Sequence, residues 1–166
     1  GDLPSVSEMF HYWGGAADKL HGETVQIGPA SLNYTIHEPI GVVGIIVPWN
    51  SPLAILAAKV GAALAAGNAI VLKASEHAAA PLLECGRLVA EAGIPDGVVN
   101  IVTGHAEPCG RALTTHPLVA KIAFTGGPQA AGHVIRNSAE NFAHVSLELG
   151  GKAPAIEAPA RKITHD

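Results

Sequence analysis

Five short apolar runs recur between residues 41 and 149, and their spacing constrains the fold more than any other feature. They cover residues 41–47, 69–73, 98–102, 121–124 and 145–149. Each run is continuous rather than alternating with polar residues, which indicates strands buried on both faces of a sheet. The stretches between them are long enough for helical crossovers, which are typical of parallel strands with right-handed connections. The sequence therefore predicts an α/β fold with a Rossmann-like, doubly wound parallel sheet.

Helix signals fill the gaps between these runs. We expect helices over residues 52–66, 77–92, 108–114 and 129–141. Pro52 suits a first helical turn, where its missing N–H costs nothing, and Gly67-Asn68 suits a left-handed helix end. Ser75 is a candidate N-cap for the second of these helices, and Gly93 is expected to close it.

Residues 1–40 follow a different pattern. Residues 6–20 are expected to form a helix with one apolar face, and residues 24–39 are expected to form a β-hairpin turning at Gly28-Pro29, outside the main sheet. The sequence thus predicts an N-terminal helix and hairpin (1–40), a nucleotide-binding domain (41–156) and a tail of uncertain structure (157–166).

Composition excludes several classes of protein. Hydrophobic residues make up 48% and charged residues 14%, which favours a packed core over disorder. The net charge of −4 comes without a basic stripe, so nucleic acid is not an expected partner. The most apolar stretch, residues 53–72, is interrupted by Lys59 and Gly67-Asn68, so we expect no membrane span. Two distant cysteines and nine histidines without ligand spacing predict no metal site and a reducing, cytoplasmic location.

In parallel sheets, ligands bind at the carboxyl ends of the strands, and polar or glycine-rich segments follow four of the predicted strands. The first is Pro48-Trp49-Asn50. An asparagine here is either a turn former or a carboxamide donor for a developing oxyanion. The second contains Lys73, Ser75 and Glu76. These residues form either a helix cap with an exposed ion pair or a binding site for ribose hydroxyls. In the second case, the acidic Glu76 would repel a 2′-phosphate.

The third segment, 124–127, reads Phe-Thr-Gly-Gly and precedes a predicted helix. Glycines allow the backbone to approach a ligand, and a helix N-terminus offers free N–H groups to a pyrophosphate. The fourth begins with Glu148 and continues Leu-Gly-Gly-Lys. Glu148 is a candidate general base, and the alternative is a salt bridge with Lys152.

Together, the motifs PWN, KASE, FTGG and LELGGKAP, in this order and spacing, resemble the aldehyde dehydrogenase superfamily over residues 7–156. The resemblance implies NAD as cofactor, with NADP possible. It implies that Asn50 completes an oxyanion hole, that Glu148 is the general base and that Lys59 matches a helix lysine linked to proton handling. The residues assigned to the cofactor are Ile46, Val47, Pro48, Trp49, Lys73, Ser75, Glu76, Phe124, Thr125, Gly126, Gly127, Leu149 and Gly150.

The implied reaction oxidises an aldehyde to a carboxylic acid through a thiohemiacetal and a thioester on a cysteine. The resemblance implies that this cysteine lies C-terminal to the LELGG segment, in a motif that the chain does not reach. Cys85 falls within a predicted helix, and Cys109, at the start of another, is expected near the adenine side. The chain by itself is therefore predicted to be inactive. The resemblance also implies a homodimer or homotetramer, with the hairpin in the oligomerisation arm. Alternatives are a catalytically inactive nucleotide-binding or scaffold module, and an acyl-phosphate or acyl-CoA reductase, against which Glu148 argues.

Overall fold

The computed structural model describes residues 2–151. The elements, in chain order, are α1 (Leu3–Ala16), η1 (Ala17–Lys19), β1 (Thr24–Val25), β2 (Asn33–Tyr34), β3 (Val42–Ile46), α2 (Pro52–Ala65), β4 (Ala69–Ala74), α3 (Ala80–Glu91), β5 (Val99–Thr103), η2 (Ala106–Gly110), α4 (Arg111–Thr115), β6 (Val119–Thr125), α5 (Pro128–Ser138) and β7 (His144–Glu148). The predicted tail, residues 157–166, and the last part of the predicted nucleotide-binding domain lie outside the described residues.

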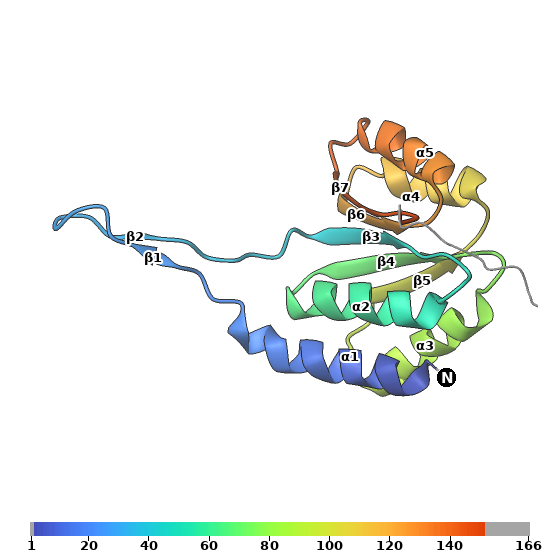
Figure 1. Cartoon of the computed structure of the whole chain (residues 1–166), viewed down its shortest axis with the longest axis horizontal. Helices are drawn as coiled ribbons and strands as arrows, with labels where there is room; N and C mark the ends of the chain where they lie inside the picture. Colours follow the sequence, from blue (N-terminus) through green and yellow to red (C-terminus); the bar gives the residue numbers. More distant parts are fainter. Residues whose placement is uncertain (1, 152–166) are drawn as a thin grey trace, which may run out of the picture.

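The main sheet has five parallel strands in the order β5-β4-β3-β6-β7 (Figure 1). Within this sheet, the chain first forms the central strand β3 and then β4 and β5 on one side of it. It then crosses over to form β6 and β7 on the other side of β3. The strand order therefore reverses between β3 and β6. This arrangement confirms the prediction of a doubly wound α/β sheet.

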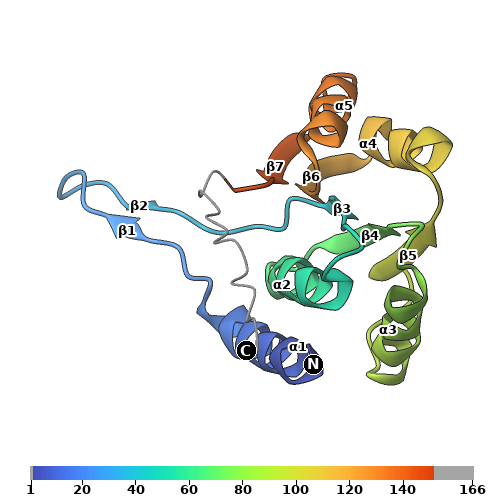
Figure 2. The same cartoon turned by 45° about the vertical axis from the view of Figure 1, so that its right-hand side comes forward.

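Helices cover both faces of this sheet (Figures 1 and 2). One face carries α2 and α3, with α1 packed against α2, and its core includes the fully buried Ile45, Leu72 and Leu82. The other face carries α4 and α5, and its core includes Ile122 and Val134. Burial of these apolar side chains on two faces is the main stabilisation available to the domain.

The edge strands depart from the prediction of two buried faces. The side chains of β5 and β7 are half-buried or exposed, whereas the three central strands carry most of the buried positions. An apolar run alone does not distinguish a central strand from an edge strand, because both pack against helices on part of their surface.

Local chemistry sets most of the element boundaries. Pro52 opens α2, and Gly67 ends it with a φ of +76°, as expected. The N-cap prediction for Ser75 is wrong. Its Oγ accepts a hydrogen bond from the N–H of His77 at 3.3 Å, in a turn that precedes α3. α3 begins only at Ala80 because Pro81 has no N–H to donate and fits only the first helical turn.

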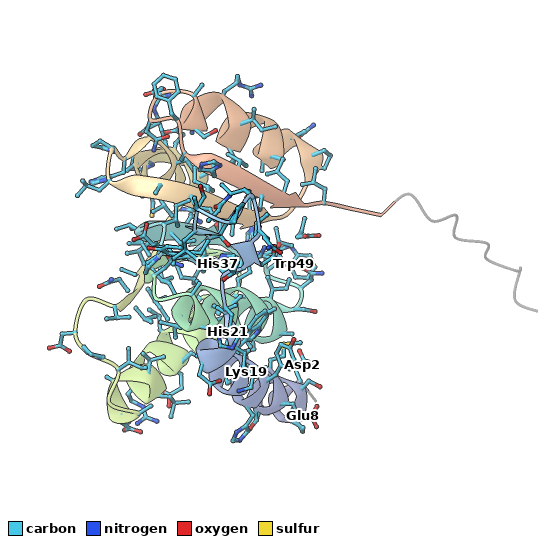
Figure 3. The ribbon with its side chains drawn as sticks, turned by 90° about the vertical axis from the view of Figure 1, so that its left-hand side faces the viewer. Asp2, Glu8, Lys19, His21, His37 and Trp49 are labelled. Atoms are coloured by element: carbon cyan, nitrogen blue, oxygen red, sulfur yellow. The ribbon has the colours of Figure 1, made fainter. Side chains whose placement is uncertain are left out.

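The N-terminal hairpin forms outside the main sheet, as predicted. β1 and β2 pair antiparallel, with Thr24 opposite Tyr34 and Val25 opposite Asn33. This arm projects away from the sheet and its covering helices (Figures 1 and 2). Figure 3, viewed from the arm's side, shows His37 on the arm, and Lys19 and His21 where the arm leaves α1. The arm exposes large apolar side chains, with Ile27, Leu32 and Tyr34 each at least 60% accessible.

None of the helices formed by residues 2–151 has the length and apolar character needed to cross a bilayer. Within the same residues, there is no cluster of three or more His, Cys, Asp or Glu side chains suited to holding a metal ion.

Candidate functional site

A cavity of about 350 Å³ lies at the point where the strand order reverses. Ile46, at the end of β3, is in register with Phe124 of β6 on one side and with Lys73 of β4 on the other. The sheet thus brings three of the predicted segments together at the carboxyl ends of its strands. The predicted cofactor residues that line the cavity are Ile46, Val47, Pro48, Lys73, Ser75, Glu76, Phe124, Thr125, Gly126 and Gly127.

An ionic cluster forms one wall of this cavity. The Lys73 ammonium is buried, donates to the Ala74 carbonyl at 3.0 Å and lies 3.5 Å from the Glu76 carboxylate. The other Glu76 oxygen lies 3.6 Å from Nδ1 of His105. A hydrogen bond from its own backbone N–H, together with Lys73 and His105, lowers the pKa of Glu76 and outweighs the opposing effect of burial. Glu76 is therefore held as a carboxylate facing the cavity.

The Gly126-Gly127 turn forms a second wall and leads into α5. The Gly126 N–H donates to the Glu148 carbonyl at 3.2 Å, which ties the turn to β7. A Cβ on Gly126 would lie 2.6 Å from Cζ of the buried Phe124, so no larger residue fits without moving the ring. A Cβ on Gly127 would have no neighbouring atom within 4 Å, so at this point the backbone itself faces the cavity. An exposed backbone beside a helix N-terminus is suited to binding an anion.

A second cavity, of about 730 Å³, lies on the opposite face of the sheet, beneath α1 and α2. Its walls are mostly apolar but include Glu148, Lys59 and Lys121. Lys121 donates to Oγ of Ser146 at 2.8 Å. Burial lowers the pKa of Lys59; Glu148 opposes this shift and Lys121 adds to it. This cavity therefore places a carboxylate near a lysine that is easier to deprotonate than usual.

Four predicted residues, Trp49, Asn50, Leu149 and Gly150, are exposed and line neither cavity. Trp49 is 63% accessible and is labelled in Figure 3. Asn50 lies in the loop from β3 to α2, at the same edge of the sheet as Glu148, the last residue of β7. Because β6 lies between β3 and β7, the ends of these two strands are about 10 Å apart. The convergence of Asn50 and Glu148 on one reacting group stays a prediction.

Residues outside the assigned cofactor set complete the first cavity. They come from η2, α4 and α5, and are Ala106, Glu107, Gly110, Arg111, Thr114, Ala130, His133, Val134 and Asn137. The last four follow a helical spacing of three and four residues, so helical periodicity could have identified them as one face of α5. No sequence pattern predicted the approach of His105 to Glu76. It depends on the conformations of the two loops that follow the adjacent strands β4 and β5.

The two cysteines are free thiols. Cys85 lies in α3 and packs against the core, as predicted, and burial, followed by the charge of Glu84, raises the pKa of its thiol. Its environment therefore disfavours the thiolate that nucleophilic attack requires. Cys109 lies in η2, where it packs against Gly104.

Comparison with known proteins identifies the family. The model of the aldehyde dehydrogenase family matches residues 1–161. The chain is 56% identical over 152 residues to the (Z)-2-((N-methylformamido)methylene)-5-hydroxybutyrolactone dehydrogenase of Acinetobacter baylyi, covering 91% of this chain and 31% of that protein. It is 47% identical over 157 residues to the mitochondrial aldehyde dehydrogenase of Sus scrofa, covering 93% and 30%.

Solved structures agree. An aldehyde dehydrogenase from Bacillus cereus in complex with NAD+ superimposes with a TM-score of 0.90 at 46% identity, covering 93% of this chain and 31% of that one. A 3,6-anhydro-L-galactose dehydrogenase in complex with NAP superimposes with a TM-score of 0.87 at 41% identity, covering 93% and 32%. The chain belongs to the aldehyde dehydrogenase family, as the motifs predicted, and spans about a third of the length of these relatives.

Proposed function

We propose that this chain contributes the cofactor site and part of the reaction centre of an NAD-linked aldehyde dehydrogenase. One observation carries the proposal: ten residues chosen from sequence motifs line a single cavity at the strand-order reversal. This is where open α/β sheets bind their ligands. The NAD+ complex of the similar Bacillus cereus enzyme supports NAD as the cofactor, and the NAP complex of the anhydrogalactose dehydrogenase supports NADP as a possible one.

The residues of the cavity fit a dinucleotide. Glu76, paired with Lys73, can accept hydrogen bonds from the adenosine ribose. Gly127, whose Cβ position is open, and the first turn of α5 can hold the pyrophosphate. Leu149 and Gly150, exposed after β7, are assigned to the nicotinamide end. When bound, NAD supplies the electron acceptor for the oxidation.

The remaining chemistry falls to Glu148 and Asn50. Glu148, with its carboxylate in the second cavity, would take a proton from the attacking thiol or from the hydrolytic water. Lys59, whose pKa is lowered in the same cavity, could pass that proton onward. Asn50 would donate its carboxamide N–H to the oxyanion. The thiol would come from a cysteine outside these 166 residues, because burial in α3 disfavours the Cys85 thiolate and Cys109 lies in η2, packed against Gly104.

Steady-state kinetics of the full-length protein with NAD and a series of aldehydes tests the proposal. Glu148→Gln should reduce kcat by about 10²–10⁴-fold, and Asn50→Ala by about 10²–10³-fold, while NAD still binds. Glu84→Gln is the matched control, because Glu84 pairs with Arg87 on the exposed side of α3. Full turnover in Glu148→Gln would overturn the assignment of the base.

For the isolated chain, the position of its cysteines favours nucleotide binding without turnover. Calorimetry should detect NAD binding, and the same sample should not oxidise aldehydes above the blank rate. Turnover above that rate would refute the proposal that the nucleophile lies elsewhere.

The arm supports a proposal about assembly. Its exposed Ile27, Leu32 and Tyr34 would be covered by a second copy of the full-length protein, giving a homodimer or homotetramer in the cytoplasm. Light scattering of the full-length protein should give two or four subunits, and replacing Ile27 and Leu32 with serine should lower that number. A monomer before substitution would contradict the assignment.

A further inference from the structure

The histidine beside Glu76 has no part in the proposed reaction, yet it lies against the group that would contact the adenosine ribose. His105 follows β5, and its Nδ1 lies 3.6 Å from one Glu76 oxygen, while Lys73 lies 3.5 Å from the other. The His105 side chain is 79% accessible, so the imidazole is open to solvent. The Glu76 side chain is 35% accessible and lines the cofactor cavity.

The charge facing the ribose therefore depends on His105. With a neutral imidazole, Glu76 and Lys73 form a balanced pair, and a ribose 2′-phosphate would meet the Glu76 carboxylate. With a protonated imidazole, two cations surround that carboxylate, and the local charge changes from about zero to +1. Histidine ordinarily makes this change between about pH 5 and pH 8.

We propose that His105 determines the discrimination between NAD and NADP by neutralising Glu76 when protonated, so that tolerance of a 2′-phosphate rises as the pH falls. This inference rests on the proposed cofactor site. It adds a residue that contributes to specificity from outside the cavity wall.

Other charged groups face the same region and must be kept in view. Lys73 comes from the segment that carries Glu76, Glu107 from η2, Arg111 from α4 and His133 from α5. Arg111 is paired with Glu140 at 3.3 Å, which reduces its share in the field at the ribose. Glu76, whose pKa is lowered, stays ionised across pH 5 to 8. The histidines are therefore the groups to separate by mutation.

The test measures the dissociation constants of NAD+ and NADP+ for the full-length protein by calorimetry at pH 5.5 and pH 8.0. The quantity compared is the ratio of the NADP+ constant to the NAD+ constant. Two unit charges about 4 Å apart in water change an equilibrium about fivefold, so raising the pH should increase this ratio about fivefold more in the wild type than in His105→Gln. The phosphate itself titrates near pH 6, and His105→Gln retains that contribution.

His77→Gln is the matched control, because it removes a histidine from the Glu76 segment and should keep the wild-type pH dependence. Glu76→Gln should lower this ratio at pH 8.0, because it removes the carboxylate that the 2′-phosphate would meet. If both nucleotides bind and the ratio varies with pH equally in the wild type and in His105→Gln, the role of His105 is refuted while the cofactor site stands. If neither nucleotide binds, the cofactor site and the inference are both overturned.

Discussion

The turn at Gly126-Gly127 allows a strict test, because two adjacent glycines are predicted to respond differently to the same substitution. In Gly126→Ala the new methyl group would lie 2.6 Å from Cζ and 3.1 Å from Cε1 of Phe124. Phe124 is 5% accessible and packs in the core beneath α5, so admitting the methyl group requires its packed ring to shift. In Gly127→Ala the methyl group would meet open space, at an ordinary φ of −77°.

The expected magnitudes follow from these contacts. Overpacking a core by one methyl group costs about 1–3 kcal/mol. Replacing glycine by alanine at a tolerated backbone conformation returns about 0.4–1 kcal/mol through the unfolded state. Gly126→Ala should therefore lower the free energy of unfolding by about 1–2 kcal/mol, and Gly127→Ala should leave it unchanged or slightly raised. NAD affinity should fall in both variants, because Gly127 is proposed to contact the pyrophosphate.

Urea denaturation of the nucleotide-free protein measures the first quantity, and calorimetry with NAD measures the second. A double-mutant cycle with Phe124→Leu isolates the contact, since the smaller side chain should remove most of the cost of Gly126→Ala. Equal unfolding free energies for the two alanine variants would refute the packing argument. A Gly127→Ala variant with unchanged NAD affinity would refute the proposed position of the pyrophosphate.

Two further substitutions test the scaffold. Asn68 is 8% accessible; its side chain accepts a hydrogen bond from the Gly41 N–H at 3.1 Å and donates one to the Ala63 carbonyl at 3.2 Å. Asn68→Ala should therefore lower the free energy of unfolding, measured by urea denaturation, by about 1–3 kcal/mol. A change within error of zero would contradict this. The pKa of Lys59 is lowered by burial, so the unfolded chain binds more protons than the folded chain between the folded and unfolded pKa values, and stability rises with pH across that interval. The stabilisation gained in Lys59→Met should therefore be largest at pH 7 and shrink toward about pH 10; a gain that is independent of pH would show that burial of the charge is not its cause.

The sequence predicted the sheet well because each of its strands is a continuous apolar run between breakers. Gly67, for example, both ends α2 and fixes the start of β4. The same reasoning failed at Ser75, where a cap residue was judged without the constraint from Pro81. It also failed for β5 and β7, because apolar content does not report the position of a strand in the sheet.

The site was predictable where one segment carries it and not where two segments meet. Lys73, Glu76 and the two glycines of the 124–127 segment follow directly from motifs at strand ends. The pairing of Glu76 with His105 joins positions 29 residues apart, and Lys121 reaches the cavity of Glu148 from the neighbouring strand. Such contacts arise from strand order and register, which the sequence of a single chain does not specify.

The crystal structure of the full-length protein with bound NAD tests the central claim most directly. We expect the pyrophosphate against the backbone of Gly127, the adenosine ribose on Glu76, and the side chains of Asn50 and Glu148 both directed toward the nicotinamide end. A nucleotide bound away from the end of β6, or Asn50 and Glu148 directed to opposite sides of the sheet, would contradict the account.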